Sequence, residues 1–163
     1  MHLREANATD YELVTRLLAE AYDWAGDKHL TLEQVMADPH ASHYVAGWQR
    51  PTDFGTVAVE NDEPLGAIWA RVFAPDQPGY GFVAADIPEL GLAVLPGARG
   101  RGIGGILLGA GIEQARALGW PALSLSVEDG NLVARSLYLR HHFRVVGRNG
   151  GSDTMLLDLR PAD

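Results

Sequence analysis

The chain has 163 residues, of which 47% are hydrophobic and 21% charged, a balance that is typical of one globular domain and not of a disordered chain. Its net charge of −8 argues against nonspecific nucleic-acid binding, which needs a basic surface. The absence of cysteine excludes a disulfide, a thiolate nucleophile and a cysteine-bound zinc ion. We therefore expect a single domain over residues 1–163.

Charge is distributed unevenly along the chain. Residues 1–98 contain 15 acidic and 5 basic side chains, whereas residues 99–163 contain 6 acidic and 8 basic ones. Lys28 is the one lysine, so nearly every cation is an arginine, the side chain that binds phosphate through two parallel hydrogen bonds. The second half could therefore hold a phosphorylated cofactor while the acidic first half faces a cationic substrate. Solvated charges that bind nothing explain the same asymmetry equally well.

No targeting or membrane segment is predicted. The first ten residues lack the apolar stretch of a secretory signal. No run approaches the roughly 18 apolar residues of a membrane-spanning helix. We therefore expect a cytoplasmic protein that binds neither a membrane nor nucleic acid.

The N-terminal third predicts a short strand followed by two helices. Residues 2–5 form the predicted strand, and Asp10 is the expected N-cap of the first helix. The second helix is expected to begin at Thr31, because Thr31 and Gln34 match a capping box. Pro39 should end it, since proline lacks the backbone donor that a helix interior needs.

The rest of the chain predicts strands and helices in alternation. Apolar segments bounded by turn residues predict strands at 56–60, 65–73, 90–95, 123–127, 143–146 and 154–159. Helices are predicted at 103–118 and 131–141. The first two strands should form an antiparallel hairpin, and so should the last two. The predicted fold class is mixed α/β.

A glycine-rich turn between a strand and a helix is the most informative segment. Gly100 to Gly105 include four glycines, flanked by Arg99 and Arg101. Glycine lets the backbone approach a ligand closely, and the free N–H groups at a helix start point toward an anion. The segment therefore predicts a phosphate or pyrophosphate site.

The same turn also matches a dinucleotide fingerprint. Gly100, Gly102 and Gly105 satisfy G-x-G-x-x-G, and Glu128 follows 23 residues later. In that motif the first glycine ends the strand, but here residues 96–99 intervene. A dinucleotide site is therefore the weaker alternative.

Two motifs stand in the second half of the chain. The first is Arg99-Gly-Arg-Gly-Ile-Gly104, after Val94-Leu-Pro96. The second begins at Asn131 and continues through Ala134 and Leu137-Tyr138 to Phe143. Together they resemble the GNAT superfamily of N-acetyltransferases, whose acyl-CoA signature the first motif matches. The opening Leu3-Arg4-Glu5-Ala6 with Asp10 also fits the start of the family. His142 stands where the family usually has glycine, which we expect to alter only a local turn.

The resemblance implies a fold and a cofactor site. The implied fold is a mixed, largely antiparallel sheet of about seven strands, splayed around the strand at 90–95 and flanked by about four helices. The cofactor would be acetyl-CoA, without a metal ion. The implied cofactor contacts are Leu92, Ala93 and Val94 for pantetheine, the amides of Arg99, Gly100, Arg101, Gly102, Ile103 and Gly104 for pyrophosphate, and Asn131 for pantetheine or as a helix cap.

The resemblance also implies direct attack of an amine on the thioester. Tyr138 matches the tyrosine of the family that protonates the departing thiolate, although a core aromatic would fit the same position. Glu89, at the start of the strand with the cofactor contacts, is the candidate base. Asp86 or a water chain is the alternative. A protein N-terminus is a weaker acceptor candidate, because Ser126 stands where some family members carry a glutamate.

The predicted function is transfer of an acetyl group from acetyl-CoA to a primary amine of a small molecule or peptide. The loops at 24–55 and 74–88 are expected to build the amine pocket, and aromatic residues in the acidic half could line it. The alternatives are a non-catalytic acyl-CoA-binding regulator and, more remotely, a dinucleotide-dependent oxidoreductase. The family often dimerises, so a homodimer is a further expectation.

Overall fold

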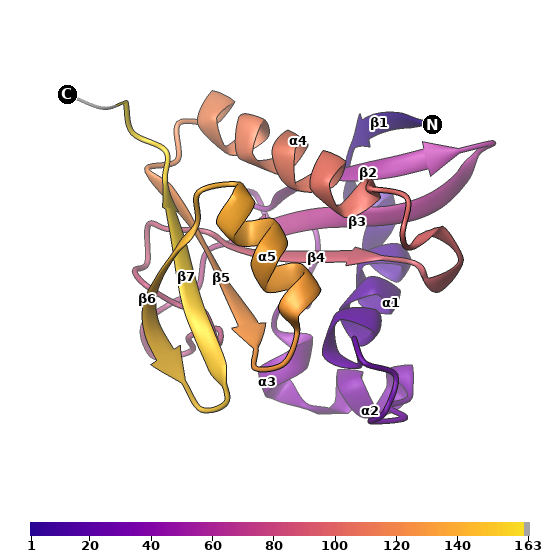
Figure 1. Cartoon of the computed structure of the whole chain (residues 1–163), viewed down its shortest axis with the longest axis horizontal. Helices are drawn as coiled ribbons and strands as arrows, with labels where there is room; N and C mark the ends of the chain where they lie inside the picture. The colour runs from indigo at the N-terminus through magenta and orange to yellow at the C-terminus, as the bar shows by residue number, and fades with distance from the viewer. Residues whose placement is uncertain (162–163) are drawn as a thin grey trace. The chain divides into compact units, whose positions relative to one another are not determined.

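The computed structural model describes residues 1–161, whose strands form one seven-stranded sheet with the order β1-β2-β3-β4-β5-β7-β6 (Figure 1). The strands are β1 His2–Glu5, β2 Phe54–Glu60, β3 Glu63–Arg71, β4 Glu89–Val94, β5 Ala122–Glu128, β6 Arg144–Asn149 and β7 Ser152–Asp158. The α-helices are α1 Tyr11–Tyr22, α2 Leu32–Ala37, α3 Pro39–Ser42, α4 Ile103–Ala117 and α5 Leu132–Arg140. The predicted mixed α/β class with a mostly antiparallel sheet is confirmed. The expected splay of the sheet stays a prediction.

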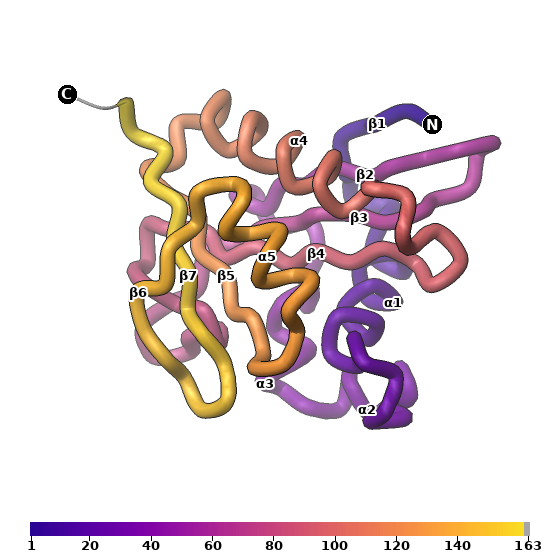
Figure 2. Tube along the Cα trace, viewed as in Figure 1, coloured from indigo at the N-terminus to yellow at the C-terminus, as the bar shows by residue number. Residues whose placement is uncertain are grey.

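The chain folds into two compact units. The first consists of residues 1–71 and 91–111. Its strands β1, β2 and β3 pair antiparallel, and β2 with β3 forms the predicted hairpin, drawn in magenta in Figure 2. The apolar face of α1 contributes Val14, Leu17 and Leu18 to the core of this unit.

Helix starts in the first unit confirm the two predicted N-cap residues. Thr31 and Gln34 do form a capping box for α2. Asp10 is the N-cap residue of α1, as predicted, but its side chain bonds to no amide of this helix; its carboxylate accepts two hydrogen bonds from Arg4 and one from the Asn7 amide. Residues 1–161 contain five α-helices, in keeping with the expected number of about four, and Pro39 begins the short helix α3 as well as following α2. Proline is well suited to a first helical position, where no N–H is required.

The second unit consists of residues 72–90 and 112–163, of which 162 and 163 are outside the described part. Strand β7 pairs antiparallel with both β5 and β6, and β6 with β7 forms the hairpin predicted around residues 149–151. Strands β4 and β5 are parallel, with Glu89 opposite Ser124, which makes the sheet mixed. The core of this unit includes Leu123, Leu125 and Met155.

Among the described residues, no helix combines the length and apolar character needed to cross a membrane.

Candidate active site

The glycine-rich turn lies in the first unit, between β4 and α4. Gly100 and Gly102 both adopt a φ of +77°, in the left-handed region that favours glycine. A Cβ built at either position would meet no atom within 4 Å. Both glycines are therefore needed for backbone conformation and not for packing, and the space beside the turn is open to a ligand.

Backbone donors at the start of α4 add to this turn. The Ile106 amide donates to the Gly102 carbonyl at 3.3 Å. The amides before Ile106 thus lie in the first turn, where helical N–H groups have no partner within the helix. Ile103 and Leu107 are buried and anchor the helix. The arrangement fits the pyrophosphate of a coenzyme, because aligned amides and the positive end of the helix dipole favour an anion.

Both arginines of the turn are paired with carboxylates in this structure. Arg99 Nη2 lies 3.0 Å from a Glu20 oxygen, and Arg99 Nε donates to the Val94 carbonyl at 3.1 Å. Arg101 Nη2 donates to both Glu60 oxygens, at 2.8 and 3.1 Å. This hydrogen bond lowers the pKa of Glu60, so its carboxylate stays charged. A phosphate that binds one of these arginines would have to displace the carboxylate of Glu20 or Glu60 from it.

The segment of β4 predicted to bind pantetheine is only half-buried. Leu92, Ala93 and Val94 retain intermediate exposure, although β4 is the central strand in the order of the sheet. Beside them, Gly66 of β3 fits tightly, since a Cβ there would lie 2.6 Å from the Ala93 carbonyl oxygen. The main chain of β4 is therefore held in a fixed position.

Glu89, the candidate base, lies in the second unit and is almost completely buried, with 2% exposure. One of its carboxylate oxygens accepts a hydrogen bond from the Gly81 amide at 2.9 Å. The neighbouring Ser124 is also buried, and its hydroxyl has no hydrogen-bond partner. Asp86, in contrast, is exposed on a loop. The role of Glu89 as a base stays a prediction.

Asn131 and Tyr138 lie on α5 in the same unit. The Asn131 side chain accepts from the Ala134 amide at 3.3 Å, so the predicted helix cap is confirmed. Tyr138 is 7% exposed and packs against Phe143 with ring centroids 5.9 Å apart. Burial raises the pKa of Tyr138 to about 12, which keeps its hydroxyl protonated at neutral pH, as a proton donor requires.

The position of His142 shows why the family prefers glycine there. His142 follows the C-terminal end of α5 with a φ of +69°, and its amide donates to the Leu139 carbonyl. A residue with a Cβ is strained in this conformation by roughly 1–2 kcal/mol.

Replacing His142 by glycine is therefore expected to stabilise the protein by about 0.5–1 kcal/mol, since part of the relief is offset by the larger entropy of unfolded glycine. Urea denaturation measures the change in unfolding free energy. His141→Gly is the control: His141 has a φ of −95°, so glycine there should destabilise the protein. A destabilised His142→Gly variant would contradict this account of the turn.

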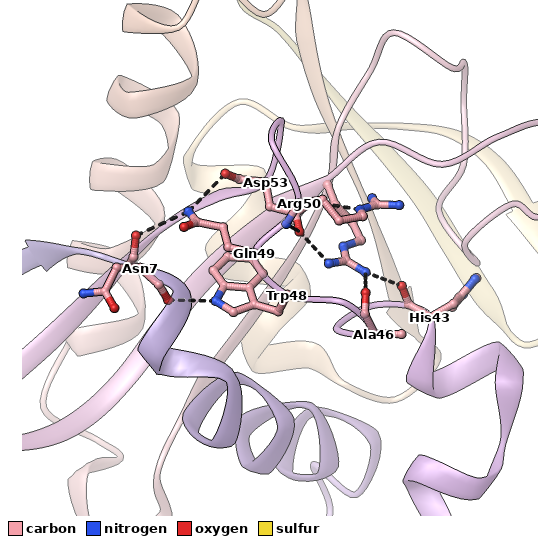
Figure 3. Close-up of polar contacts among 9 residues, drawn as sticks. Asn7, His43, Ala46, Trp48, Gln49, Arg50 and Asp53 are labelled. Atoms are coloured by element: carbon pink, nitrogen blue, oxygen red, sulfur yellow. Dashed lines mark hydrogen bonds and ion pairs between the residues drawn. The ribbon is translucent and has the colours of Figure 1, made fainter.

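A polar network in the first unit, absent from the sequence prediction, fixes the segment between α3 and β2 (Figure 3). The buried Arg71 forms an ion pair with Asp53 at 2.5 Å and donates to the carbonyls of His43 and Ala46. Trp48 Nε1 donates to the Asn7 carbonyl at 2.9 Å. The expected loop at 24–55 is thus partly helical and tightly held.

The predicted site residues divide between the two units. All the predicted cofactor contacts from Leu92 to Gly104 belong to the first unit, whereas Glu89, Asn131 and Tyr138 belong to the second. Within residues 1–161, no group of three or more metal-ligating side chains is present.

Comparison with known proteins identifies the class of protein that this fold and turn define. The model of the Acetyltransferase (GNAT) family matches residues 18–143, and the chain belongs to this family. Mycothiol acetyltransferase of Amycolatopsis mediterranei is 29% identical over 136 residues, which are 82% of this chain and 42% of that protein. The same enzyme of Rhodococcus opacus is 31% identical, over 80% of this chain and 41% of that protein. The chain thus spans about two-fifths of the length of these relatives.

Solved structures show the same fold. The protein yncA of Salmonella typhimurium, solved with its cofactor acetyl-CoA, has a TM-score of 0.70 and 21% identity, over 100% of this chain and 96% of that one. A GCN5-related N-acetyltransferase of Kribbella flavida has a TM-score of 0.66 and 25% identity, over 96% of each chain.

Proposed function

We propose that the protein transfers an acetyl group from acetyl-CoA to a primary amine by direct attack. The observation that carries this proposal is the left-handed turn at Gly100 and Gly102, open in front of the amide end of α4, in a chain of the GNAT family. Mycothiol acetyltransferases among its relatives and an acetyl-CoA complex among its structural neighbours support the same choice of acetyl donor.

The residues of the chain would supply four things to the reaction. Acetyl-CoA provides an activated acetyl group, whose bond to sulfur breaks as the amine nitrogen bonds to the carbonyl carbon. Glu89, or water held near it, would take the proton that the attacking amine must lose. The main chain near Val94 would donate a hydrogen bond to the thioester oxygen, and Tyr138 would give its proton to the departing sulfur. The amides of the glycine-rich turn would hold acetyl-CoA in place.

The test is release of CoA with a panel of primary amines, compared between the natural protein and Tyr138→Phe. We expect acetyl transfer to at least one amine, and a kcat about 100-fold lower in the variant with little change in acetyl-CoA affinity, because only the proton donor is lost. The pKa of about 12 also predicts no loss of this proton donor between pH 7 and roughly pH 10.

Tyr11→Phe is the matched control, since Tyr11 is 40% exposed on α1. An unchanged kcat in Tyr138→Phe would make Tyr138 a core aromatic only. Binding of acetyl-CoA without CoA release for any amine would instead favour the non-catalytic regulator.

A further inference from the structure

The accessible part of strand β4 begins at Gly91. Residues 91–94 are half-buried, whereas Leu90 just before them in the chain is only 5% exposed. These four residues and the glycine-rich turn belong to the same compact unit. A donor whose pyrophosphate lies at the turn, and whose pantetheine runs back along β4 from Val94 to Leu92, therefore has its acyl group beside Gly91.

The indole ring of Trp69 takes the place of a side chain at Gly91. A Cβ on Gly91 would lie 2.5 Å from Trp69 Cζ2 and 2.6 Å from Trp69 Cε2, which is too close for any side chain. Trp69 lies on β3, the neighbour of β4 in the sheet (Figure 1), and is 1% exposed. The ring therefore packs directly against the β4 main chain at the point where the accessible stretch ends.

Trp69 lies on the face of the sheet opposite α4. Its neighbour Ile68 packs against this helix, since a Cβ on Gly111 would lie 2.5 Å from Ile68 Cδ1. Successive side chains of a strand point to opposite faces, so the side chain of Trp69 points away from α4. A change at Trp69 should therefore leave the start of α4 and its amides in place.

The indole N–H of Trp69 does not favour stability. Among residues 1–161, no group accepts a hydrogen bond from the buried Nε1 atom. The indole N–H can only donate, and a buried donor without an acceptor destabilises the folded state. Buried polar groups of this kind are uncommon and occur at functional sites. Tryptophan at this position therefore favours a role other than stability, for which the size of the ring matters.

We infer that Trp69 restricts the acyl group of the donor to acetyl, because its indole ring occupies the space into which a longer acyl chain would extend. The inference rests on the proposed function. Trp69 is then a specificity-determining residue for the donor, and the missing side chain of Gly91 is what lets the ring reach the acyl end.

The test measures the Kd of acetyl-CoA, propionyl-CoA and butyryl-CoA by calorimetry, for the natural protein and for Trp69→Phe. The three donors differ only in the acyl chain, so the ratio of their Kd values reports on that chain alone. Phenylalanine keeps an aromatic ring but is shorter, so the ring atoms that cover Gly91 are lost. Trp48→Phe is the matched control, because Trp48 is a second buried tryptophan of the same unit, 7% exposed, whose Nε1 donates to the Asn7 carbonyl.

In the natural protein we expect butyryl-CoA to bind at least about 10-fold more weakly than acetyl-CoA, because its two additional methylene groups meet the indole ring. In Trp69→Phe the two Kd values should lie within about 3-fold of each other, since the longer chain fills the space that the ring has left. Trp48→Phe should keep the natural ratio. A natural ratio near 1, or the same ratio in the natural protein and in Trp69→Phe, would overturn the inference.

Thermal unfolding shows whether each variant is folded. If Trp69→Phe does not fold, Trp69→Met is the second variant, because its flexible side chain fills the core and can still move aside for a longer acyl chain. The same fall in the ratio of Kd values is expected. An unchanged ratio in a folded Trp69→Met variant would overturn the inference.

Binding and turnover separate this inference from the proposed function. A ratio of Kd values that falls in Trp69→Phe, but not in Trp48→Phe, supports the role of Trp69 even when no amine is acylated. Acetylation of an amine, with the same preference for acetyl-CoA in Trp69→Phe as in the natural protein, supports the proposed function and overturns the inference. Failure of all three donors to bind the natural protein would overturn both.

Discussion

Acetyl-CoA should no longer stabilise the protein against thermal unfolding when Gly102 is replaced by valine. The φ of +77° at Gly102 is strongly unfavourable for a branched side chain. The turn must then shift, and the amides at the start of α4 no longer point toward one position. Losing two charge-assisted hydrogen bonds of about 1.5 kcal/mol each corresponds to a roughly 100-fold weaker affinity.

Gly97→Ala is the control for this variant. Gly97 lies in the same segment, and an added Cβ would meet nothing within 4 Å, but its φ is not left-handed. Alanine there should leave the shift in melting temperature with acetyl-CoA unchanged. If Gly102→Val still binds acetyl-CoA with natural affinity, the cofactor does not use this turn. A melting shift with NAD in place of acetyl-CoA would favour the dinucleotide alternative.

Replacing Arg71 by methionine is expected to lower the unfolding free energy by about 3–5 kcal/mol, because Asp53 is left charged and buried with only the partly exposed Arg50 as its ion-pair partner. The variant also removes the donors to the carbonyls of His43 and Ala46. Figure 3 labels Asp53, His43 and Ala46 within this network of polar contacts. Urea denaturation measures the loss.

Arg50→Met is the matched control. Arg50 also bonds to Asp53, at 3.3 Å, but its side chain is 40% exposed, so its removal should cost about 1 kcal/mol or less. If Arg71→Met does not fold, the double variant Arg71→Met, Asp53→Leu should restore folding, because no unpaired charge remains. Equal losses in the two single variants would contradict the importance of the buried pair.

Local patterns were sufficient to predict most of the fold. The alternation of residues 56–60 and the turn after them specify a hairpin, because both depend on neighbours in sequence. The capping box at Thr31 and Gln34 is equally local. Asp10 stands at the predicted N-cap position, but the hydrogen bonds of its carboxylate depend on Arg4, whose side chain reaches it from β1. The sequence alone could not show that this carboxylate was already engaged.

The site was less predictable than the fold. The conformation of Gly100 and Gly102 follows from residue type, and so the anion site could be proposed from the sequence. The burial of Glu89 depends on Gly81 lying over β5, which no spacing reveals. Arg71 and Asp53 are 18 residues apart in sequence, and they meet only once the chain has folded. The packing of Trp69 on Gly91 depends on the register of two strands and leaves no sequence signal.

The carboxylates that pair with Arg99 and Arg101 have a kinetic consequence. The two arginines of the turn are neutralised by Glu20 and Glu60, so the turn carries little net charge. Its electric field therefore does not extend far into solvent. The amide dipoles act only over the first turn of the helix. The association rate of an anionic ligand is then set by ordinary diffusion and by how well the ligand fits the turn on contact. This rate should depend weakly on ionic strength. Abundant polyanions gain no advantage in reaching this turn.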